Sequence, residues 1–504
     1  MAQTDGQEPI LYVEDGSMAV LPHGATPMRH ATTASQRTIP KGASAAHGEG
    51  EKAAGGADEE DVSDVMAALE KQEKAPFPEG GKEAWLTVLG VFCCTMVTFG
   101  VLNTYGVYQA YFKQTYLSNY SNFAINWIGT AQYVGIFGAG LPMGKLFDLG
   151  FFRPCFLVGA VMLTASQLGL SFANSFATLF VAQGLFMGIG MGIVFNMAIA
   201  CPSHWFLKRR GMALGLAAAG SSTGGGKLST SPHLLFPRTN PFTSPVCFPI
   251  MIQRLIPRIG FGWSMRVIFF IEIVMLTIAW FTIRTRLPPA IDVRDKSKGG
   301  WKQVKWIDIH AFKNPAYTMI VIGFGLVVFG LYTPFTYMDV FTSHYKIPAN
   351  GYFLSIMNAA SMFGRILPGF VADKVGRTNT ILPFLTLAGI LLFIFPLCTS
   401  LGGLIPFAIL YGFASGGHVS LQPAVVAQLG PTESVGVRVG NMIAFQALGS
   451  VCQPFVGLIL GGDPETGYRW WGACAFSGAL VLSGASCLMI GRFFALGGKL
   501  FGRI

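Results

Sequence analysis

Charged residues are scarce in this sequence, and they are unevenly distributed. Only 12% of its 504 residues are Asp, Glu, Lys or Arg, whereas 52% are hydrophobic. A soluble globular domain usually carries about a quarter charged residues. The first 83 positions hold 15 of the 25 acidic residues and 7 of the 35 basic ones. The rest of the chain is therefore poor in acid and rich in apolar runs, which indicates a polytopic helical membrane protein.

The sequence also lacks the motifs of several function classes. Its nine Cys show neither metal-ligand spacing nor a disulfide framework, so we expect no metal site and no cofactor. Paired catalytic carboxylates and a nucleophile elbow are absent, and no strand precedes the Gly-rich run 184–195. The basic residues lie in short loops between apolar spans, which argues against a nucleic-acid partner. We predict that the protein is not an enzyme.

Twelve apolar segments are long enough to cross a bilayer. A hydrocarbon core of about 30 Å needs about 20 helical residues. We expect spans at roughly 84–108, 126–147, 154–174, 177–200, 211–257 (interrupted), 264–285, 315–340, 351–372, 379–398, 403–428, 437–461 and 469–493. The fold class is therefore all-α.

Polar stretches divide the chain into parts. Residues 1–83 are low in apolar content and predict a disordered acidic cytoplasmic tail. The predicted parts that follow are an N-terminal half at 84–285, a central cytoplasmic loop at 286–314, a C-terminal half at 315–493 and a cytoplasmic tail at 494–504. Basic loops gathered on one side place both termini in the cytoplasm. We expect a multi-pass protein of the plasma membrane.

The fifth span is interrupted by a polar, Pro-rich segment at 226–245. An unpaired backbone group in lipid costs several kcal/mol, so this segment would have to leave the span or disrupt it. Its codons can carry a 5′ splice signal at 226–227, a branch site at 239–240 and a 3′ signal at 245–246. Removing it keeps the frame and joins two helix pieces, so we interpret it as a retained intron. The alternative is a functional extra loop.

Two loops share a pattern of Gly, acid, Gly and Arg. The first is "GKLFDLGFFRP" after the second span, and the other is "GFVADKVGR" after the eighth. Gly lets two helices approach closely, while an Asp at a helix end can cap a neighbouring helix or pair with an Arg. Two copies in corresponding halves are typical of parallel repeats. The predicted conformational latch consists of Gly144, Asp148, Arg153, Gly369, Asp373, Gly376 and Arg377.

With these loops, nearly all of 84–493 resembles the major facilitator superfamily. The stretches "PEGGKEAWLTVLGVF", "SIMNAASMFGRILPGFVAD" and "GNMIAFQALGSVCQPFVGLIL" resemble its fungal monocarboxylate-transporter-like branch. The resemblance implies twelve transmembrane helices in two rocking six-helix halves. It also implies secondary active transport of a small organic molecule, either acidic and monocarboxylate-like or a secondary metabolite. Asn103 and Ser361 stand where animal lactate carriers have the Lys and Asp linked to proton coupling.

Polar residues within the predicted spans are candidates for the cargo site, because charges at membrane depth are costly and usually functional. Arg365 matches a substrate-linked Arg of the branch and is expected to attract acidic cargo, although it could also snorkel or form a structural ion pair. Glu272 could couple protons or pair with Arg266. The predicted cargo-binding residues are Arg365, Asn103, Tyr105, His418, Asn196 and Asn358, and the coupling candidates are Glu272 and Asp339.

Three functions are compatible with the sequence. The favoured one is a transporter working by alternating access, driven by a proton gradient or by the cargo gradient. The others are a sensor or scaffold with the 83-residue tail as its output, and a nonfunctional product of the interrupted span. The pattern Asn119-Tyr120-Ser121 predicts N-glycosylation on the first outer loop. We expect a monomer whose partners are the lipid bilayer and a small-molecule cargo.

Overall fold

The computed structural model places most of the chain in one helical unit. The described residues are 10–12, 18–20, 77–225, 248–286, 309–347, 352–430, 434–451, 453–461, 467–499 and 502. Two compact units divide at Ala75 and Pro76. In the first unit, strands β1 (Ile10–Tyr12) and β2 (Met18–Val20) pair antiparallel. The rest of the predicted tail as far as Pro76, and the segment 226–245, fall outside the described residues.

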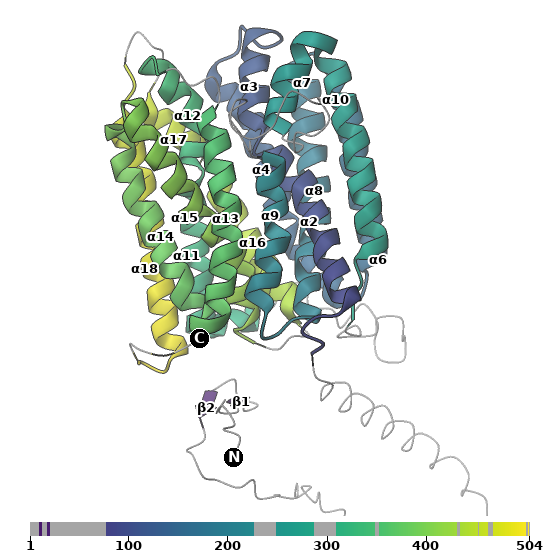
Figure 1. Ribbon diagram of the computed structural model, residues 1–504, viewed down its shortest axis with the longest axis vertical. Coiled ribbons are helices and arrows are strands. Elements are labelled where there is room, and N and C mark those ends of the chain that lie inside the picture. The colour runs from purple at the N-terminus through teal and green to yellow at the C-terminus, as the bar shows by residue number, and fades with distance from the viewer. Residues whose placement is uncertain are drawn as a thin grey trace, which may run out of the picture. The chain divides into compact units, whose positions relative to one another are not determined.

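The second unit is a bundle of long helices that run along its vertical axis in Figure 1. The N-terminal half comprises α2 (Lys82–Leu102), α3 (Tyr105–Gln114), α4 (Asn122–Gly138), α5 (Gly140–Asp148), α6 (Phe152–Leu170), α7 (Phe176–Leu179), the π-helix η1 (Phe180–Met187), α8 (Gly188–Ala200), η2 (Cys201–His204), α9 (Arg210–Gly225) and α10 (Phe248–Thr282). The C-terminal half comprises η5 (Ile309–Lys313), α11 (Pro315–Leu331), α12 (Thr333–His344), α13 (Tyr352–Val375), α14 (Arg377–Ile394), η6 (Phe395–Leu397), α15 (Leu401–Ala427), α16 (Val435–Val451), α17 (Gln453–Leu460) and α18 (Trp470–Ala495).

Ten helical stretches among the described residues are long and apolar enough to cross a membrane. They match ten of the twelve predicted spans. The predicted span 126–147 corresponds to α4 and α5, which meet at Ala139. The interrupted span corresponds to α9 and the first part of α10, which turns at Gly260 with a φ of 78°. The predicted all-α polytopic fold is confirmed.

Local sequence explains where several helices begin. The hydroxyl of Ser121 accepts a hydrogen bond from the Ala124 N–H at 3.2 Å, which caps α4. The side chain of Asn314 accepts one from the Ala316 N–H at 3.0 Å, ahead of α11. Pro315 occupies the first turn of α11, where its missing N–H leaves no donor unpaired. These caps set where α4 and α11 begin.

The first span of each half is broken at a corresponding position. In the N-terminal half the break between α2 and α3 lies at Asn103 and Thr104, whose hydroxyl donates to the Gly100 carbonyl at 2.9 Å. In the C-terminal half α11 ends at Tyr332, and Pro334 opens α12. Discontinuous helices in paired repeats are where carriers of this architecture form their sites. Asn103 and Tyr332 are therefore expected beside a site.

The two halves approach backbone to backbone at one end of the bundle. A Cβ added to Gly144 of α5 would lie 2.2 Å from the Gly436 carbonyl oxygen of α16. A Cβ on Gly369 of α13 would lie 2.6 Å from the Gly211 carbonyl oxygen of α9. Only glycine fits at contacts this short. The Gly pairs thus close this end of the interface, where α2 begins and α18 ends (Figure 1).

Candidate functional site

Asp148 joins the two halves through the start of a helix. Its carboxylate accepts hydrogen bonds from the N–H groups of Gly436 at 2.9 Å and Val437 at 2.8 Å. These are unpaired donors of the first turn of α16, where the helix dipole also favours a negative charge. We call this contact the Asp148 latch.

Asp373 makes the same contact in the opposite direction. This residue of α13 accepts from the N–H groups of Gly211 at 2.8 Å and Met212 at 2.9 Å, in the first turn of α9. Arg377 supports this Asp373 latch: its Nε lies 3.9 Å from the Asp373 carboxylate, and its Nη2 donates to the Leu207 carbonyl at 2.7 Å. Each half therefore contributes one acid and one helix N-terminus, which gives the pair a two-fold character.

The other motif residues shape the loops around the latches. Gly376 has a φ of 108°, a left-handed conformation that favours glycine, at the turn into α14. Arg153 lies apart from Asp148 and donates to the carbonyls of Trp280 and, at 3.2 Å, Ile283. It thereby ties α6 to the end of α10 within its own half. The motif spacing thus located both acids, and the structure adds their donors.

Removing one latch charge is expected to destabilise the closed arrangement. In the Asp373→Asn variant one amide oxygen replaces two carboxylate oxygens, so one N–H of α9 loses its partner. The loss of a helix cap costs about 0.5–2 kcal/mol. We expect a lower melting temperature of the purified protein in detergent, with Glu83→Gln, an exposed acid on α2, as the control. Equal melting of the two variants would contradict the latch.

Glu79 adds a contact that the sequence pattern did not predict. Its carboxylate accepts from three successive backbone N–H groups, those of Leu207 at 2.9 Å, Lys208 at 2.6 Å and Arg209 at 3.0 Å. The residue has a φ of 48°, a strained left-handed backbone conformation that persists only where surrounding contacts hold it. The segment before α2 is thereby fixed to the loop that carries Leu207, the acceptor of Arg377. The stretch "PEGG" was the only signal in the sequence.

Arg365 lies in a small cavity between the halves. Its guanidinium donates to the Ser361 hydroxyl at 3.3 Å and across the interface to the Ala218 carbonyl of α9 at 2.8 Å. Within the described chain both acceptors are neutral, and the side chain is only 5% exposed. The cavity, which we call the Arg365 cavity, measures about 20 Å³. Its other lining residues include Thr95, Phe99, Phe195, Tyr332 and Gln422.

A second cavity lies beside the break in the first span. It measures about 40 Å³, and we call it the Tyr105 cavity. Asn103, Tyr105 and Asn126 line it from the N-terminal half, and Thr336 and Tyr337 from the C-terminal half. Cavities of this size hold only a few water molecules. The structure is therefore closed around its centre, and an organic cargo requires the halves to separate.

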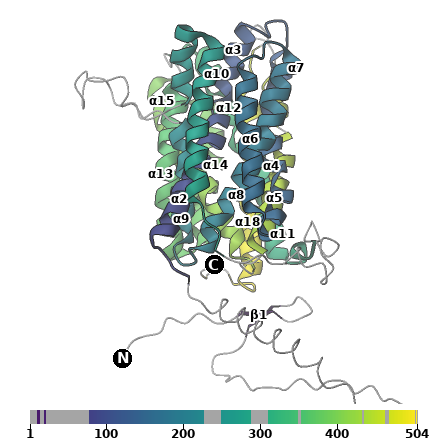
Figure 2. The same cartoon turned by 90° about the vertical axis from the view of Figure 1, so that its right-hand side faces the viewer.

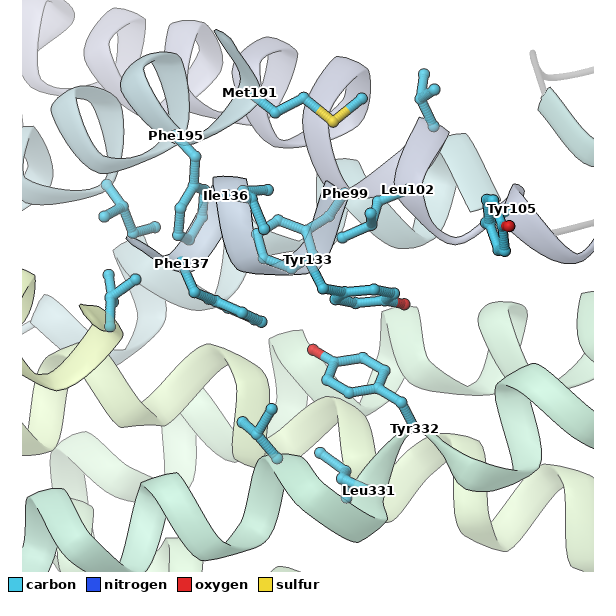
Figure 3. Packing of buried hydrophobic residues seen from close by; sticks show 14 of the residues in the cluster. Phe99, Leu102, Tyr105, Tyr133, Ile136, Phe137, Met191, Phe195, Leu331 and Tyr332 are labelled. Carbon is cyan, nitrogen blue, oxygen red and sulfur yellow. The ribbon is translucent and has the colours of Figure 1, made fainter. Parts of the chain in front are cut away.

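Two tyrosines separate the two cavities. Tyr133 of α4 lines the Tyr105 cavity and Tyr332 lines the Arg365 cavity, with their ring centroids 5.4 Å apart. Figure 3 shows the rings meeting across the interface, with Phe99, Phe137 and Phe195 packed nearby. We call this contact between the two linings the Tyr133–Tyr332 partition. The sequence did not predict it, because both residues look like ordinary aromatic residues of apolar spans.

Three predicted cargo residues line neither cavity. His418 of α15 is 1% exposed and packs against Phe324, with a ring centroid distance of 5.5 Å. Asn196 donates to the Ile136 carbonyl at 3.2 Å and to the Gly192 carbonyl at 2.7 Å. Asn358 donates to the Leu354 carbonyl at 3.0 Å within its own helix. In this closed state Asn196 holds two helices together, and a cargo contact by any of the three remains a prediction.

The remaining predicted residues are scattered. Glu272 is fully buried inside the N-terminal half. Asp339 is half-buried on α12. Asn119 is exposed in the loop after α3, which leaves it accessible to glycosylation. The structure thus brings Arg365 close to the centre, places Asn103 and Tyr105 at the neighbouring cavity, and separates both coupling candidates from them.

A groove of about 1020 Å³ lies between α6 and η1. Its lining is mainly aliphatic and aromatic and includes Leu157, Val161, Phe172 and Phe186. It has no charged group among its lining residues. On the outer face of a membrane helix such a surface suits lipid chains, so we place the cargo site at the interface instead.

A polytopic helix bundle whose halves close around a buried cation, and are latched symmetrically at one end, has the build of a membrane carrier. The sequence profile of the Major Facilitator Superfamily matches residues 87–232 and 242–454. The MFS transporter asaE of Aspergillus flavus is 33% identical over 435 residues, which cover 86% of this chain and 91% of that protein. This chain belongs to the Major Facilitator Superfamily, whose members are transporters and not enzymes.

Other relatives and solved structures agree with this family. The aspyridones efflux protein apdF of Emericella nidulans is 32% identical, covering 76% of this chain and 72% of that protein. The fujikurins efflux protein of Gibberella fujikuroi is 31% identical, covering 84% of this chain and 85% of that protein. The human organic anion transporter MFSD10 (TETRAN) superposes with a TM-score of 0.58 at 15% identity, over 81% of this chain and 100% of that one. FucP in its outward conformation superposes with a TM-score of 0.56 at 13% identity, over 82% of this chain and 99% of that one.

Proposed function

We propose that this transporter exports a small acidic organic molecule, a product of secondary metabolism, by alternating access. Two of the relatives above are efflux proteins by name, for aspyridones and fujikurins, which supports export of a secondary metabolite. The fungal monocarboxylate-transporter-like branch, inferred from three stretches of the sequence of which one contains Arg365, is part of the same proposal. The competing idea, a sensor or scaffold without transport, has no contact among the described residues that favours it.

The observation that carries the proposal is the environment of Arg365. A buried guanidinium is costly in a membrane unless it is paired. Here its acceptors are a hydroxyl and a carbonyl, and no acid pairs with it in the part of the chain that the structure describes. A carboxylate of the cargo would complete this site with a charge-assisted, bidentate contact. Cargo would then compete with the Ala218 carbonyl, and thereby loosen a bond between the halves.

The two cavities suggest the route. We propose that opening of the Tyr133–Tyr332 partition joins the Arg365 cavity to the Tyr105 cavity and forms the path to one side of the membrane. The two latches would remain closed in that state. In the opposite state the latches release, the Gly pairs separate, and the Arg365 cavity opens at the other end. The protein rocks between these arrangements around Arg365.

The proposed topology follows from the ends of the bundle. Helix α2 begins and α18 ends at the same end of the second unit (Figure 1), which supports two termini on one side, the cytoplasm. We further propose a glycosylated monomer of the plasma membrane. The domain boundaries given above are part of this proposal.

The segment 226–245 fits the same picture if it is a retained intron. The match to the superfamily profile is interrupted at 233–241, inside this segment. The described parts on either side, α9 and the start of α10, together supply the length of one span. A chain without the segment would therefore have a continuous fifth helix. A functional loop is the alternative interpretation.

Transport by the purified chain tests the proposal. In proteoliposomes we expect counterflow of labelled aromatic carboxylic acids, and exchange at least about tenfold slower for their methyl esters, which lack the charge that binds Arg365. The esters are the matched control, since they keep the size of the acids. Equal rates for acids and esters would contradict an acidic cargo, and absence of any exchange above empty liposomes would contradict transport.

A further inference from the structure

The interior of the N-terminal half contains a carboxyl group that the transport path does not use. Glu272 of α10 is 0% exposed, and both of its carboxylate oxygens lack a hydrogen-bond partner. Asp148 is the other acid counted as buried among the described residues, and it is fully engaged in its latch. An ionised carboxylate without a partner is very costly away from water. Glu272 therefore carries a proton in this closed state.

The surroundings of Glu272 are polar but lack a compensating charge. The Tyr108 side chain of α3 interacts electrostatically with Glu272 and has Gln167 of α6 as its other polar neighbour. Tyr108 and Gln167 are both 0% exposed, and the Tyr108 hydroxyl and the Gln167 Oε1 atom lack a partner. Buried polar atoms in folded proteins almost always find a partner, in protein or water. The helices α3, α6 and α10 thus each bury an unsatisfied polar group, and these groups influence one another electrostatically.

The cations near α10 make their recorded contacts with groups other than Glu272. Arg153 of α6 binds the last carbonyls of α10, two turns from Glu272. Arg266 of α10 itself lies against the rings of Trp263 and Phe172, and its buried Nε atom has no hydrogen-bond partner. Arg210 of α9 donates to loop carbonyls. The remaining partner helix, α2, contributes buried thiols at Cys93 and Cys94.

Helix α3 connects this region to the cargo path. On one face Tyr105 lines the Tyr105 cavity. On another, Tyr111 stacks on Phe261 of α10 with ring centroids 5.1 Å apart, and Tyr108 is near enough to interact electrostatically with Glu272. The break before α3 at Asn103 lets this short helix move separately from α2. Figure 2 shows α10 beside α6 on the outer side of the half, and none of Glu272, Tyr108 and Gln167 lines the Arg365 cavity.

We propose that Glu272, Tyr108 and Gln167 form a proton-binding site within the N-terminal half, separate from the Arg365 cavity, which couples export of cargo to entry of a proton. The inference rests on the proposed function. Glu272 binds its proton while α3 is open to the outer solution. It releases that proton when movement of α3 admits water to the carboxyl group. One proton enters as one cargo molecule leaves, and no covalent bond other than O–H changes.

The isosteric Glu272→Gln variant tests this site in proteoliposomes of the full chain with a labelled aromatic carboxylic acid. A pH difference of about one unit supports about tenfold accumulation for one coupled proton. We expect the parent protein to accumulate the acid to this extent and the variant to reach only equal concentrations. Counterflow, which needs no proton, should persist within about twofold. Glu83→Gln, the same isosteric change at an exposed acid of α2, is the control and should behave as the parent, while Asp339→Asn tests the other coupling candidate and should keep accumulation.

Two further measurements keep the proposal independent of transport. The infrared carbonyl band of a protonated carboxyl group is expected in the purified parent protein and absent in Glu272→Gln. Tyr108→Phe should shift the pH at which this band disappears. Any of three results would overturn the proton site. Accumulation driven by pH could persist in Glu272→Gln, it could be lost in Asp339→Asn, or a sodium gradient could drive accumulation in place of the pH difference. If the parent protein showed no counterflow, the proposed transport function would be contradicted. The infrared band would still report whether Glu272 is protonated.

Discussion

Replacing Arg365 with Gln is expected to lower the counterflow of acidic cargo by about 100-fold. Hydrogen bonds to a charged group contribute about 1.5–3 kcal/mol each to binding, and each 1.4 kcal/mol corresponds to about tenfold. Gln keeps a donor for the Ala218 carbonyl but carries no charge. The closed state should therefore persist while the affinity for carboxylates falls. Counterflow of the labelled acid in proteoliposomes measures the effect.

Two variants make this result specific to the cavity. Arg258→Gln removes one positive charge from an exposed position on α10 and should leave counterflow unchanged. Arg365→Lys keeps the charge but not the planar fork, so we expect an intermediate rate. If Arg365→Gln moved acids as fast as the parent, Arg365 would be a structural residue and the proposed cargo class would lose its support.

Replacing Gly144 with Val is expected to prevent closure of the latched end. A Cβ at this position would lie 2.2 Å from the Gly436 carbonyl oxygen, and the contact is backbone, which cannot rotate away. Overpacking a tight contact costs about 1–3 kcal/mol, which corresponds to about a 5- to 150-fold lower population of the closed state. Transport should fall accordingly, because the protein cannot complete its cycle.

Accessibility of the central cavity distinguishes this effect from misfolding. Ser420, which lines the Arg365 cavity, can be changed to Cys in a background free of other cysteines. In the Gly144→Val protein this thiol should react faster with a membrane-impermeant reagent added at the latched side. Gly169→Val is the control, since a Cβ on Gly169 meets nothing within 4 Å. Unchanged labelling in Gly144→Val would show that the Gly contact does not control opening.

The sequence predicted well those features that depend on a local pattern. Apolar run lengths placed the spans, and the repeated Gly–acid spacing found Asp148 and Asp373. The donors that these acids bind could not be predicted, because Gly436 and Gly211 belong to helices of the opposite half. Such partners depend on how two halves dock, which no local periodicity records.

The direction in which a side chain points was harder to predict from the sequence than its depth within a membrane span. An α-helix turns 100° per residue, and span edges known only to several residues leave its rotation undetermined. His418 and Asn196 were therefore expected at the cavity, but the structure turns them towards neighbouring helices. Tyr332 was missed for the same reason. Arg365 was found because a lone cation in an apolar span is conspicuous whichever way it points.

The latches also have a genetic consequence. In the Asp148 latch the acid binds main-chain N–H groups, so only one side of that contact is encoded by a side chain, whereas Asp373 also has Arg377 beside it. A charge reversal at a facing residue can rescue a broken ion pair, but no such exchange exists for a backbone donor. Suppressors of a change at Asp148 should therefore arise elsewhere, at positions that weaken the competing open state. The positions of suppressors selected for restored export would identify residues that stabilise the open state.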